Sequence, residues 1–260
     1  MNEQTGQTEQ LGLGRSGAAA PSRRRFLAGG AACLAAAPVL GAAGESSAYA
    51  STEDGQDVQE TSGPMPTPEQ VLRRLVEGNR RWVTGRLTHP HQTVARRLAV
   101  AGAQHPLATV FGCIDSRVPP EIVFDLGVGD LFVVRTAAQT NDGLVQGAVE
   151  YGAEEAVTPL VVVMGHQRCG AVTFAVDVLN RCATAPDHLE DVVEALRPAY
   201  EVAKPMPGDQ VDNTVRAQIR LTVEQLRADA FLRPLIHAHR MHVVGGYYSL
   251  DSGIVDFFGS

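Results

Sequence analysis

The sequence predicts an α/β fold in which a mainly parallel β-sheet is covered by helices on both faces. Four short runs rich in β-branched residues are apolar on both faces or nearly so, as strands of a covered parallel sheet are. Helical stretches separate these runs, and parallel strands require such crossover connections. The chain has 260 residues, of which 44% are hydrophobic, so it can bury one sizeable core. This composition excludes collagen-like, coiled-coil and wholly disordered chains.

The N-terminal segment is expected to be a targeting signal and not part of the folded domain. Three consecutive arginines within Ser22 to Leu27 precede an Ala/Gly-rich apolar stretch, and Ala48-Tyr-Ala50 offers a small-x-small cleavage site. Residues 1–50 therefore resemble a twin-arginine export signal, which implies an extracytoplasmic or secreted protein. The alternative is a transmembrane anchor, but glycines and prolines interrupt the run and alanine is only mildly apolar. We expect no stable membrane anchor after cleavage, and a flexible, polar leader over residues 51–66.

Residues 67–260 are expected to form a single α/β domain that begins with a helix. Thr67 offers a hydroxyl at the N-cap, Pro68 suits the first helical position and Gln70 can complete a capping box. Gly85 ends the helix. The side chains expected to share its buried face are Leu72, Leu75, Val76, Trp82 and Val83.

The remaining elements follow in alternation. A second helix is expected from about Thr93 to Gln104. The four strands are expected at residues 107–112, 130–135, 159–164 and 241–245. The later helices are expected at residues 121–126, 143–155, 171–179 and 212–230. Tyr248 to Phe258, with the turn residues Asp251-Ser-Gly253, could add a short antiparallel edge strand.

Three potential metal ligands fall where strands end. Cys113 closes the first strand, and His166 and Cys169 follow the third. Because the carboxyl ends of parallel strands meet at one edge of a sheet, we expect the three to converge. Two thiolates and one imidazole form a set typical of zinc, and three protein ligands leave the fourth tetrahedral position open, as in catalytic zinc sites.

The charged residues next to Cys113 indicate that the open coordination position holds a reacting water. Zinc can lower the pKa of a bound water to about 7. Asp115 is suited to accept the hydrogen bond of that water, and Arg117 would keep Asp115 ionised and away from the metal. If that pair broke, Asp115 could itself become the fourth ligand and close the site.

Each feature alone has a simpler explanation. A cysteine at a strand end is most often a small buried hydrophobe, and an Asp-Arg pair more often braces a loop. A redox role for Cys113 and Cys169 is a weaker alternative, since His166 intervenes and no Cys-x-x-Cys is present. The coincidence of all members at one predicted edge favours the metal site.

Cys-x-Asp-x-Arg at 113–117 and Gly165-His-Gln-Arg-Cys-Gly170 resemble the motifs of the β-class carbonic anhydrases. The resemblance extends over nearly the whole mature chain. It implies one zinc ion per chain and carbonate dehydratase activity, the reversible hydration of carbon dioxide to bicarbonate and a proton by zinc-bound hydroxide. It also implies a homodimer or higher homo-oligomer with active sites near the subunit interface.

The resemblance also assigns roles to residues. The zinc ligands correspond to Cys113, His166 and Cys169, and the Asp-Arg dyad to Asp115 and Arg117. The positions that resemble the family's narrow substrate pocket are Gln104, Phe132, Ala137 and Tyr151. Gly170 is expected to offer a backbone N–H to the nascent bicarbonate. Simple core packing is the alternative for Phe132 and Tyr151.

Two departures from the family bear on the open position. Ala138-Gln139 stands where many members have Gly-Asn, which adds bulk near the expected pocket rim. Val110 stands where a bicarbonate-inhibited subset has Trp, so we expect an open, water-bound site. The alternatives are a zinc-holding binding protein with a closed site and a hydrolase of molecules like carbon disulfide. The net charge of −7 and the lack of a basic stripe predict no nucleic-acid partner.

Overall fold

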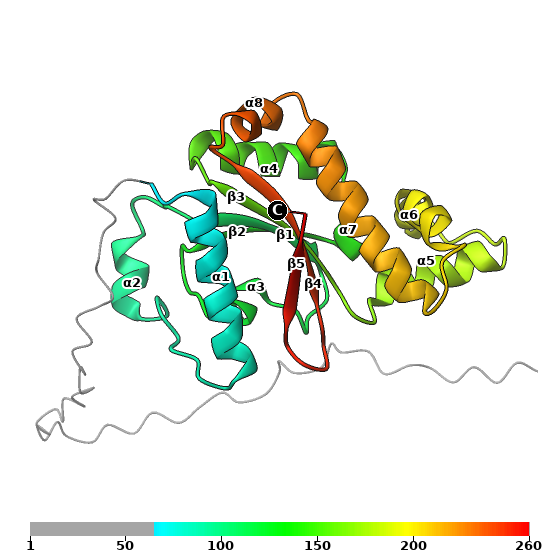
Figure 1. Ribbon diagram of the computed structural model, residues 1–260, viewed down its shortest axis with the longest axis horizontal. Coiled ribbons are helices and arrows are strands. Elements are labelled where there is room, and N and C mark those ends of the chain that lie inside the picture. The colour runs from blue at the N-terminus through cyan, green and yellow to red at the C-terminus, as the bar shows by residue number, and fades with distance from the viewer. Residues whose placement is uncertain (1–64, 260) are drawn as a thin grey trace, which may run out of the picture. The chain divides into compact units, whose positions relative to one another are not determined.

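The computed structural model describes residues 65–259, so the predicted export signal and nearly all of the predicted leader lie outside the described residues. A five-stranded sheet has the order β2-β1-β3-β4-β5 (Figure 1). The strands are β1 (Ala108–Cys113), β2 (Leu131–Thr136), β3 (Leu160–His166), β4 (His242–Tyr248) and β5 (Val255–Phe258). The first four are parallel and β5 is antiparallel, which confirms the predicted sheet and its short edge strand.

The first helix begins as predicted. In α1 (Pro68–Val83) the Gln70 N–H donates to the Thr67 hydroxyl, and the Thr67 N–H donates to the Gln70 side chain at 2.8 Å. This capping box satisfies N–H groups that the helix itself leaves unpaired. Gly85, with φ of +65°, follows the last turn.

The predicted buried face of α1 is partly wrong. Val71 and Leu75 are buried, whereas Val76 and Val83 are exposed. The reason is a close backbone approach, since a Cβ on Gly78 would lie 1.8 Å from the Phe124 carbonyl oxygen. This contact turns the Gly78 side of the helix toward the body of the protein.

Two predicted helices are shorter than expected. The second, α2 (Val94–Ala99), is capped by the Thr93 hydroxyl and closes its last turn at Val100. The next, α3 (Pro120–Val123), ends before Asp125, whose φ of +47° is left-handed and cannot continue a helix.

The other helices lie on one side of the sheet, opposite α1 and α3. They are η1 (Ala137–Gln139), α4 (Gly143–Glu155), α5 (Gly170–Asn180), α6 (Leu189–Ala203), α7 (Gln210–Ala228) and α8 (Leu232–His237). The predicted helices α4, α5 and α7 are confirmed within two residues, and α6 and α8 were not predicted. The helix α6 packs mainly on α5 and α7, so it covers helices and not the sheet.

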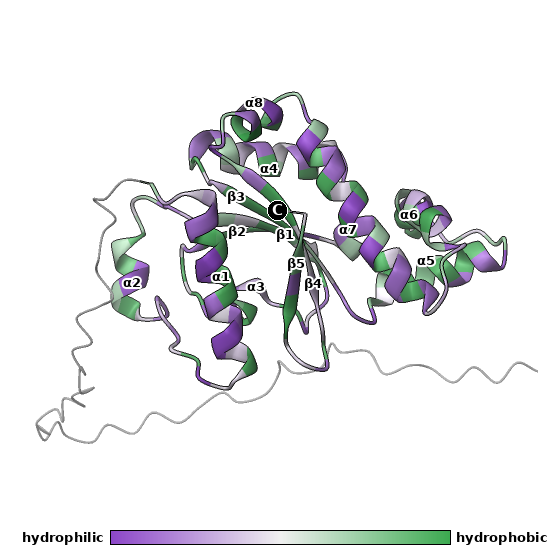
Figure 2. Cartoon of the chain, in the orientation of Figure 1, coloured by the Kyte–Doolittle hydropathy of each residue, from purple (hydrophilic) through white to green (hydrophobic). Residues whose placement is uncertain are grey.

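Two apolar cores lie on opposite faces of the sheet. In one core, the helices from α4 through α8 pack on alternate residues of β1 and β3, such as Phe111 and Val163. The other joins α1 and the α3 region with the remaining residues, such as Val110 and Val162. The strands are mainly apolar in Figure 2, whereas α1 and α7 mix hydrophilic and hydrophobic residues. Within residues 65–259, no helix has the length and apolar character needed to cross a membrane.

The strand order reverses direction next to β1. After β1 the chain adds β2 on one side and then crosses to add β3 on the other. Ligands of α/β proteins bind at such a reversal, outside the carboxyl ends of the strands. Gly112 of β1 is in register with Met164 of β3, so the last residues of both strands lie at this reversal.

Candidate metal centre

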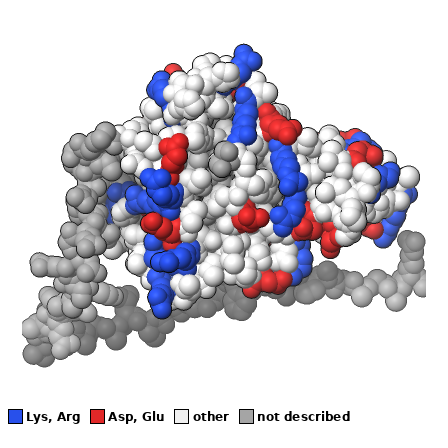
Figure 3. Space-filling view, viewed as in Figure 1, with Lys and Arg blue, Asp and Glu red and all other residues white. Residues whose placement is uncertain are grey.

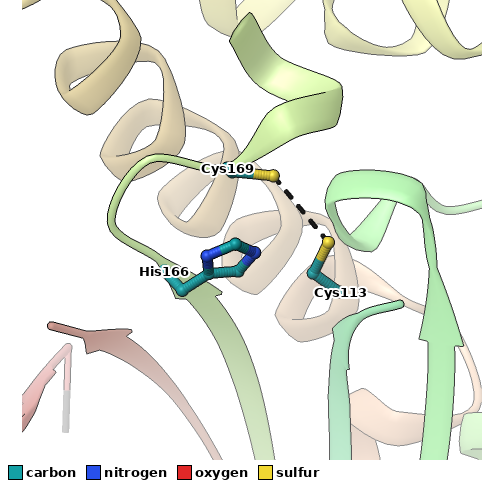
Figure 4. A group of neighbouring side chains, drawn as sticks. All are labelled: Cys113, His166 and Cys169. Atoms are coloured by element: carbon teal, nitrogen blue, oxygen red, sulfur yellow. Dashed lines mark hydrogen bonds between the residues drawn. The ribbon is translucent and has the colours of Figure 1, made fainter. Parts of the chain in front are cut away.

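The three predicted metal ligands come together at the carboxyl edge of the sheet. Cys113 ends β1, His166 ends β3 and Cys169 precedes the first residue of α5 (Figure 4). Their ligand atoms all lie within 4.8 Å of one another, and all three residues are buried. The two sulfurs are 3.8 Å apart. A tetrahedral zinc with Zn–S bonds of about 2.3 Å places two sulfurs about 3.8 Å apart, so this pair fits one shared ion.

The His166 ring is oriented for metal binding. Its Nδ1 lies 3.0 Å from the Gln167 carbonyl oxygen, a contact that requires Nδ1 to carry the proton and donate it. Nε2 then presents a lone pair, yet this buried atom has no hydrogen-bond partner among residues 65–259. A buried, unpaired polar atom is costly, whereas a metal would satisfy it.

A hydrogen bond joins the sulfurs of Cys113 and Cys169. The hydrogen bond between the Cys113 and Cys169 sulfurs lowers the pKa of Cys113, as do His166 and the Ala138 N–H. The same hydrogen bond, together with burial, raises the pKa of Cys169. A divalent cation would replace the proton of this hydrogen bond and keep both sulfurs as thiolates. The donor set therefore fits zinc in chemistry as well as in spacing.

The structure forms the predicted pair of Asp115 and Arg117. The Arg117 Nε and backbone N–H donate to Asp115 Oδ1, both at 2.9 Å, and Nη2 donates to Oδ2 at 2.7 Å. These contacts, chiefly the guanidinium, lower the pKa of Asp115 to about 2. Asp115 Oδ2 lies 3.7 Å from His166 Nε2, but the carboxylate is not part of the cluster within 4.8 Å. An ionised carboxylate thus stands beside the metal ligands while Arg117 holds it.

Arg135 braces this segment, a role that the sequence analysis missed. It lies on β2 opposite Gly112 of β1, and it donates to the Cys113 carbonyl at 2.8 Å and the Asp115 carbonyl at 2.6 Å. The sequence feature that could have indicated this role is an arginine near the end of the strand that pairs with the strand ending in Cys113.

Ala138 and Gln139, which are expected to add bulk near the pocket rim, follow the end of β2 in η1. Both are buried, in the left-handed region with φ of +56° and +47°. The Ala138 N–H donates to the Cys113 sulfur at 3.3 Å. The strained backbone thereby delivers a hydrogen bond to a metal ligand.

The residues expected to line a substrate pocket are less enclosed than the ligands. Phe132 on β2 and Tyr151 on α4 pack edge to face, with ring centroids 6.1 Å apart. Gln104 and Tyr151 are exposed, and Ala137 is half-buried at the start of η1. Gly170 is the first residue of α5, one residue before the expected start of this helix.

Comparison with known proteins agrees with this geometry. A family model described as carbonic anhydrase matches residues 108–255. Carbonic anhydrase 2 of Mycobacterium tuberculosis is 39% identical over 191 residues, which cover 73% of this chain and 92% of that protein.

Solved structures are also similar. The β-carbonic anhydrase CafA of Aspergillus fumigatus is 26% identical with a TM-score of 0.54, covering 62% of this chain and 79% of that one. Structures described as two tetrameric β-carbonic anhydrases of Sordaria macrospora include a match that shares the fold, with a TM-score of 0.57 and 20% identity over 73% of this chain and 97% of that chain. The motifs, the fold and the extent of the sequence match lead to one conclusion: the chain belongs to the β-class carbonic anhydrase family.

Proposed function

We propose that Cys113, His166 and Cys169 hold the zinc ion with which this carbonic anhydrase interconverts carbon dioxide and bicarbonate. One observation carries the assignment, namely two sulfurs 3.8 Å apart beside a buried His166 Nε2 that has no hydrogen-bond partner among the described residues. When bound, zinc supplies a Lewis acid that lowers the pKa of water to about 7, so that a nucleophile is available near neutral pH.

Asp115 orients the reacting water in this proposal. Its carboxylate is ionised and lies beside His166, so it accepts a hydrogen bond from the water and directs a lone pair toward carbon dioxide. Arg117 occupies both carboxylate oxygens, which keeps Asp115 from acting as a fourth metal ligand. This pairing favours an open site over a zinc-holding protein with a closed one.

The start of α5 serves the product. Bicarbonate is an anion, and the N-terminal end of a helix carries partial positive charge from its unpaired N–H groups. Gly170 begins this helix directly after Cys169. Its N–H is therefore assigned to the oxygen of the nascent bicarbonate.

A second copy of the chain completes the substrate side. Leu144, Ala148 and Tyr151 are spaced to share one face of α4, and all three are exposed. Tyr151 packs on Phe132, which lies on the edge strand β2. An exposed apolar strip of this kind suits a symmetric subunit contact, and the fold relatives from Sordaria macrospora are described as tetrameric.

The substrate pocket is assigned to this same side of the molecule. It closes in a homodimer or higher homo-oligomer, and the residues assigned to it are Gln104, Phe132, Ala137 and Tyr151.

On the face shown in Figure 3, basic side chains of the described residues are interleaved with acidic ones, which does not favour nucleic acid as a partner there.

Stopped-flow measurement of carbon dioxide hydration from pH 7 to 9, with zinc analysis of the same sample, tests the function. The proposal predicts activity at pH 7, loss after treatment with a zinc chelator, and recovery when zinc is restored. Activity that is absent at pH 7 and emerges only at higher pH would indicate a closed site. Turnover of carbon disulfide without hydration of carbon dioxide would favour the hydrolase alternative.

Export is a separate part of the proposal, supported by the arginine-rich start and weakly apolar stretch of residues 1–50. Twin-arginine export moves folded proteins, so the thiolates would cross with zinc in place and protected from disulfide formation. The test is the N-terminus of protein recovered outside the cytoplasm. It should be Ser51, and replacing Arg24 and Arg25 by lysine should abolish export; export of that variant contradicts the assignment.

A further inference from the structure

Two of the three metal ligands lie at the ends of a very short loop. Only Gln167 and Arg168 separate His166 from Cys169, which lie near each other in Figure 4. Arg168 has φ of +51°, in the left-handed region that residues other than glycine seldom adopt. Such a backbone conformation persists only where surrounding contacts hold it.

The Gln167 N–H donates to the Tyr248 carbonyl at 2.9 Å. The side-chain ion pair of the loop is made by Asp251, in the turn between β4 and β5. Its Oδ2 accepts hydrogen bonds from Gln167 Nε2 at 2.9 Å and from Arg168 Nη1 at 3.0 Å. Its Oδ1 accepts one from Arg168 Nη2 at 2.6 Å. In return, the Asp251 N–H donates to Gln167 Oε1 at 3.3 Å. One side chain therefore holds both residues of the loop.

The turn that carries Asp251 is itself fixed to the body of the protein. Asn79 of α1, which is buried, donates to the Gly253 carbonyl at 2.8 Å and accepts from the Val255 N–H at 2.9 Å. Gly253 has φ of +75°, and a Cβ there would lie 2.9 Å from Trp82 Nε1. The turn thus cannot shift freely, and Asp251 has a defined position from which to hold the loop.

The loop also touches the dyad. The Arg168 carbonyl lies 3.4 Å from Arg117 Nη2, within hydrogen-bond distance. A displaced Arg168 would therefore disturb Arg117 as well as His166 and Cys169.

We infer that Asp251 is a positioning residue of the metal centre: through Gln167 and Arg168 it sets the placement of His166 and Cys169. This inference rests on the proposed zinc site. It goes beyond the ligands and the dyad, because Asp251 touches neither the metal ligands nor the reacting atoms and acts from 83 residues away in the sequence.

A purely structural role makes a different prediction. The side chains of Arg168 and Asp251 are 56% and 63% exposed, and exposed ion pairs contribute little to the stability of a fold. If the pair were only a surface bridge, its loss would affect neither the fold nor the metal. Metal retention and ligand geometry are therefore the informative readouts.

The test compares Asp251→Ala with Asp177→Ala, whose carboxylate pairs with Arg181 at 2.8 Å on the exposed side of α5. Zinc-loaded proteins are mixed with excess chelator, and the rate of zinc release is followed. We expect release about tenfold faster from Asp251→Ala, the lower end for a residue that supports metal ligands. Asp251→Asn should be intermediate, and Asp177→Ala should match the wild type.

A cobalt-substituted sample provides a second readout. The visible bands of cobalt bound to two sulfurs and a nitrogen report ligand geometry, so they should shift in Asp251→Ala and not in Asp177→Ala. Release rates and spectra equal to those of the wild type would overturn the inference. If the wild-type protein itself binds no zinc, the proposed function fails; if it binds zinc and Asp251→Ala behaves identically, only this inference fails.

Discussion

The metal cluster and the α4 face of this protein differ in how completely one chain builds them. Cys113, His166 and Cys169 are at most 4% exposed and already arranged for an ion. By contrast, Tyr151 is 54% and Leu144 is 87% exposed on α4. A single chain therefore provides the metal ligands, whereas under our proposal the substrate side is completed by a second copy.

The largest effect is expected from removing a metal ligand. Cys113→Ser should lose nearly all zinc, and the hydration rate should fall to that of buffer, because a serine oxygen is a poor replacement for a thiolate. Zinc analysis and stopped-flow hydration measure both. The control is Cys182→Ser, an exposed cysteine outside the cluster that should change neither. Full activity of Cys113→Ser without zinc would remove the metal from the account.

Loss of the carboxylate should separate metal binding from turnover. Asp115→Asn should retain zinc, because Asp115 lies outside the ligand cluster, but kcat should fall about 100-fold as water orientation is lost. Metal content and hydration kinetics of the same sample test this prediction. An unchanged kcat would exclude Asp115 from the reaction.

A charge introduced on the exposed face of α4 should disrupt the proposed subunit contact and leave the metal ligands intact. Leu144→Glu should shift the protein toward monomers and lower kcat/KM about tenfold, while the zinc content stays the same, since a buried unpaired carboxylate opposes subunit contact. Light scattering, kinetics and zinc analysis provide the three readouts. Val202→Glu on α6, at a valine that is 52% exposed, is the matched control and should change none of them. A monomeric Leu144→Glu with wild-type kinetics would show that one chain suffices.

The smallest effect on function is expected at Asp125, which links α1 and the segment after it to the region that follows α3. Burial alone would raise the pKa of Asp125, but hydrogen bonds from Arg81, Thr88 and His89 outweigh it and hold the pKa below its usual value. The stability contributed by this ionised group is therefore present above about pH 4 and lost as the pH falls through the lowered pKa.

Asp125→Asn should thus lower the free energy of unfolding by about 2 kcal/mol at pH 7, and its difference from the wild type should shrink below about pH 4. Urea denaturation across this pH range measures the effect. Zinc content and subunit state at pH 7 should match those of the wild type. A difference that grows on acidification would contradict the sign of the pKa shift.

The sequence predicts the metal cluster well because its signals are local and the convergence follows a general rule. Cys113 and His166 end strands, and parallel strands share a carboxyl edge, so no contact between distant side chains has to be known. The capped start of α1 at Thr67 is likewise predicted from a local pattern, the capping box of Thr67 and Gln70.

What the sequence does not predict depends on contacts between distant segments. The rotation of α1 follows from Gly78 meeting the Phe124 carbonyl, and α6 packs on helices whose placement no local pattern specifies. Arg135 and Asp251 support the centre through hydrogen bonds that span 20 to 84 residues of sequence. The hydrophobic pattern places such residues on elements, but it does not show which side chains they meet.

X-ray absorption at the zinc edge of the purified protein tests the central claim most directly. The account predicts one zinc per chain, with two sulfur neighbours at about 2.3 Å and nitrogen or oxygen neighbours at about 2.0–2.1 Å. A first shell that contains only nitrogen and oxygen would contradict it.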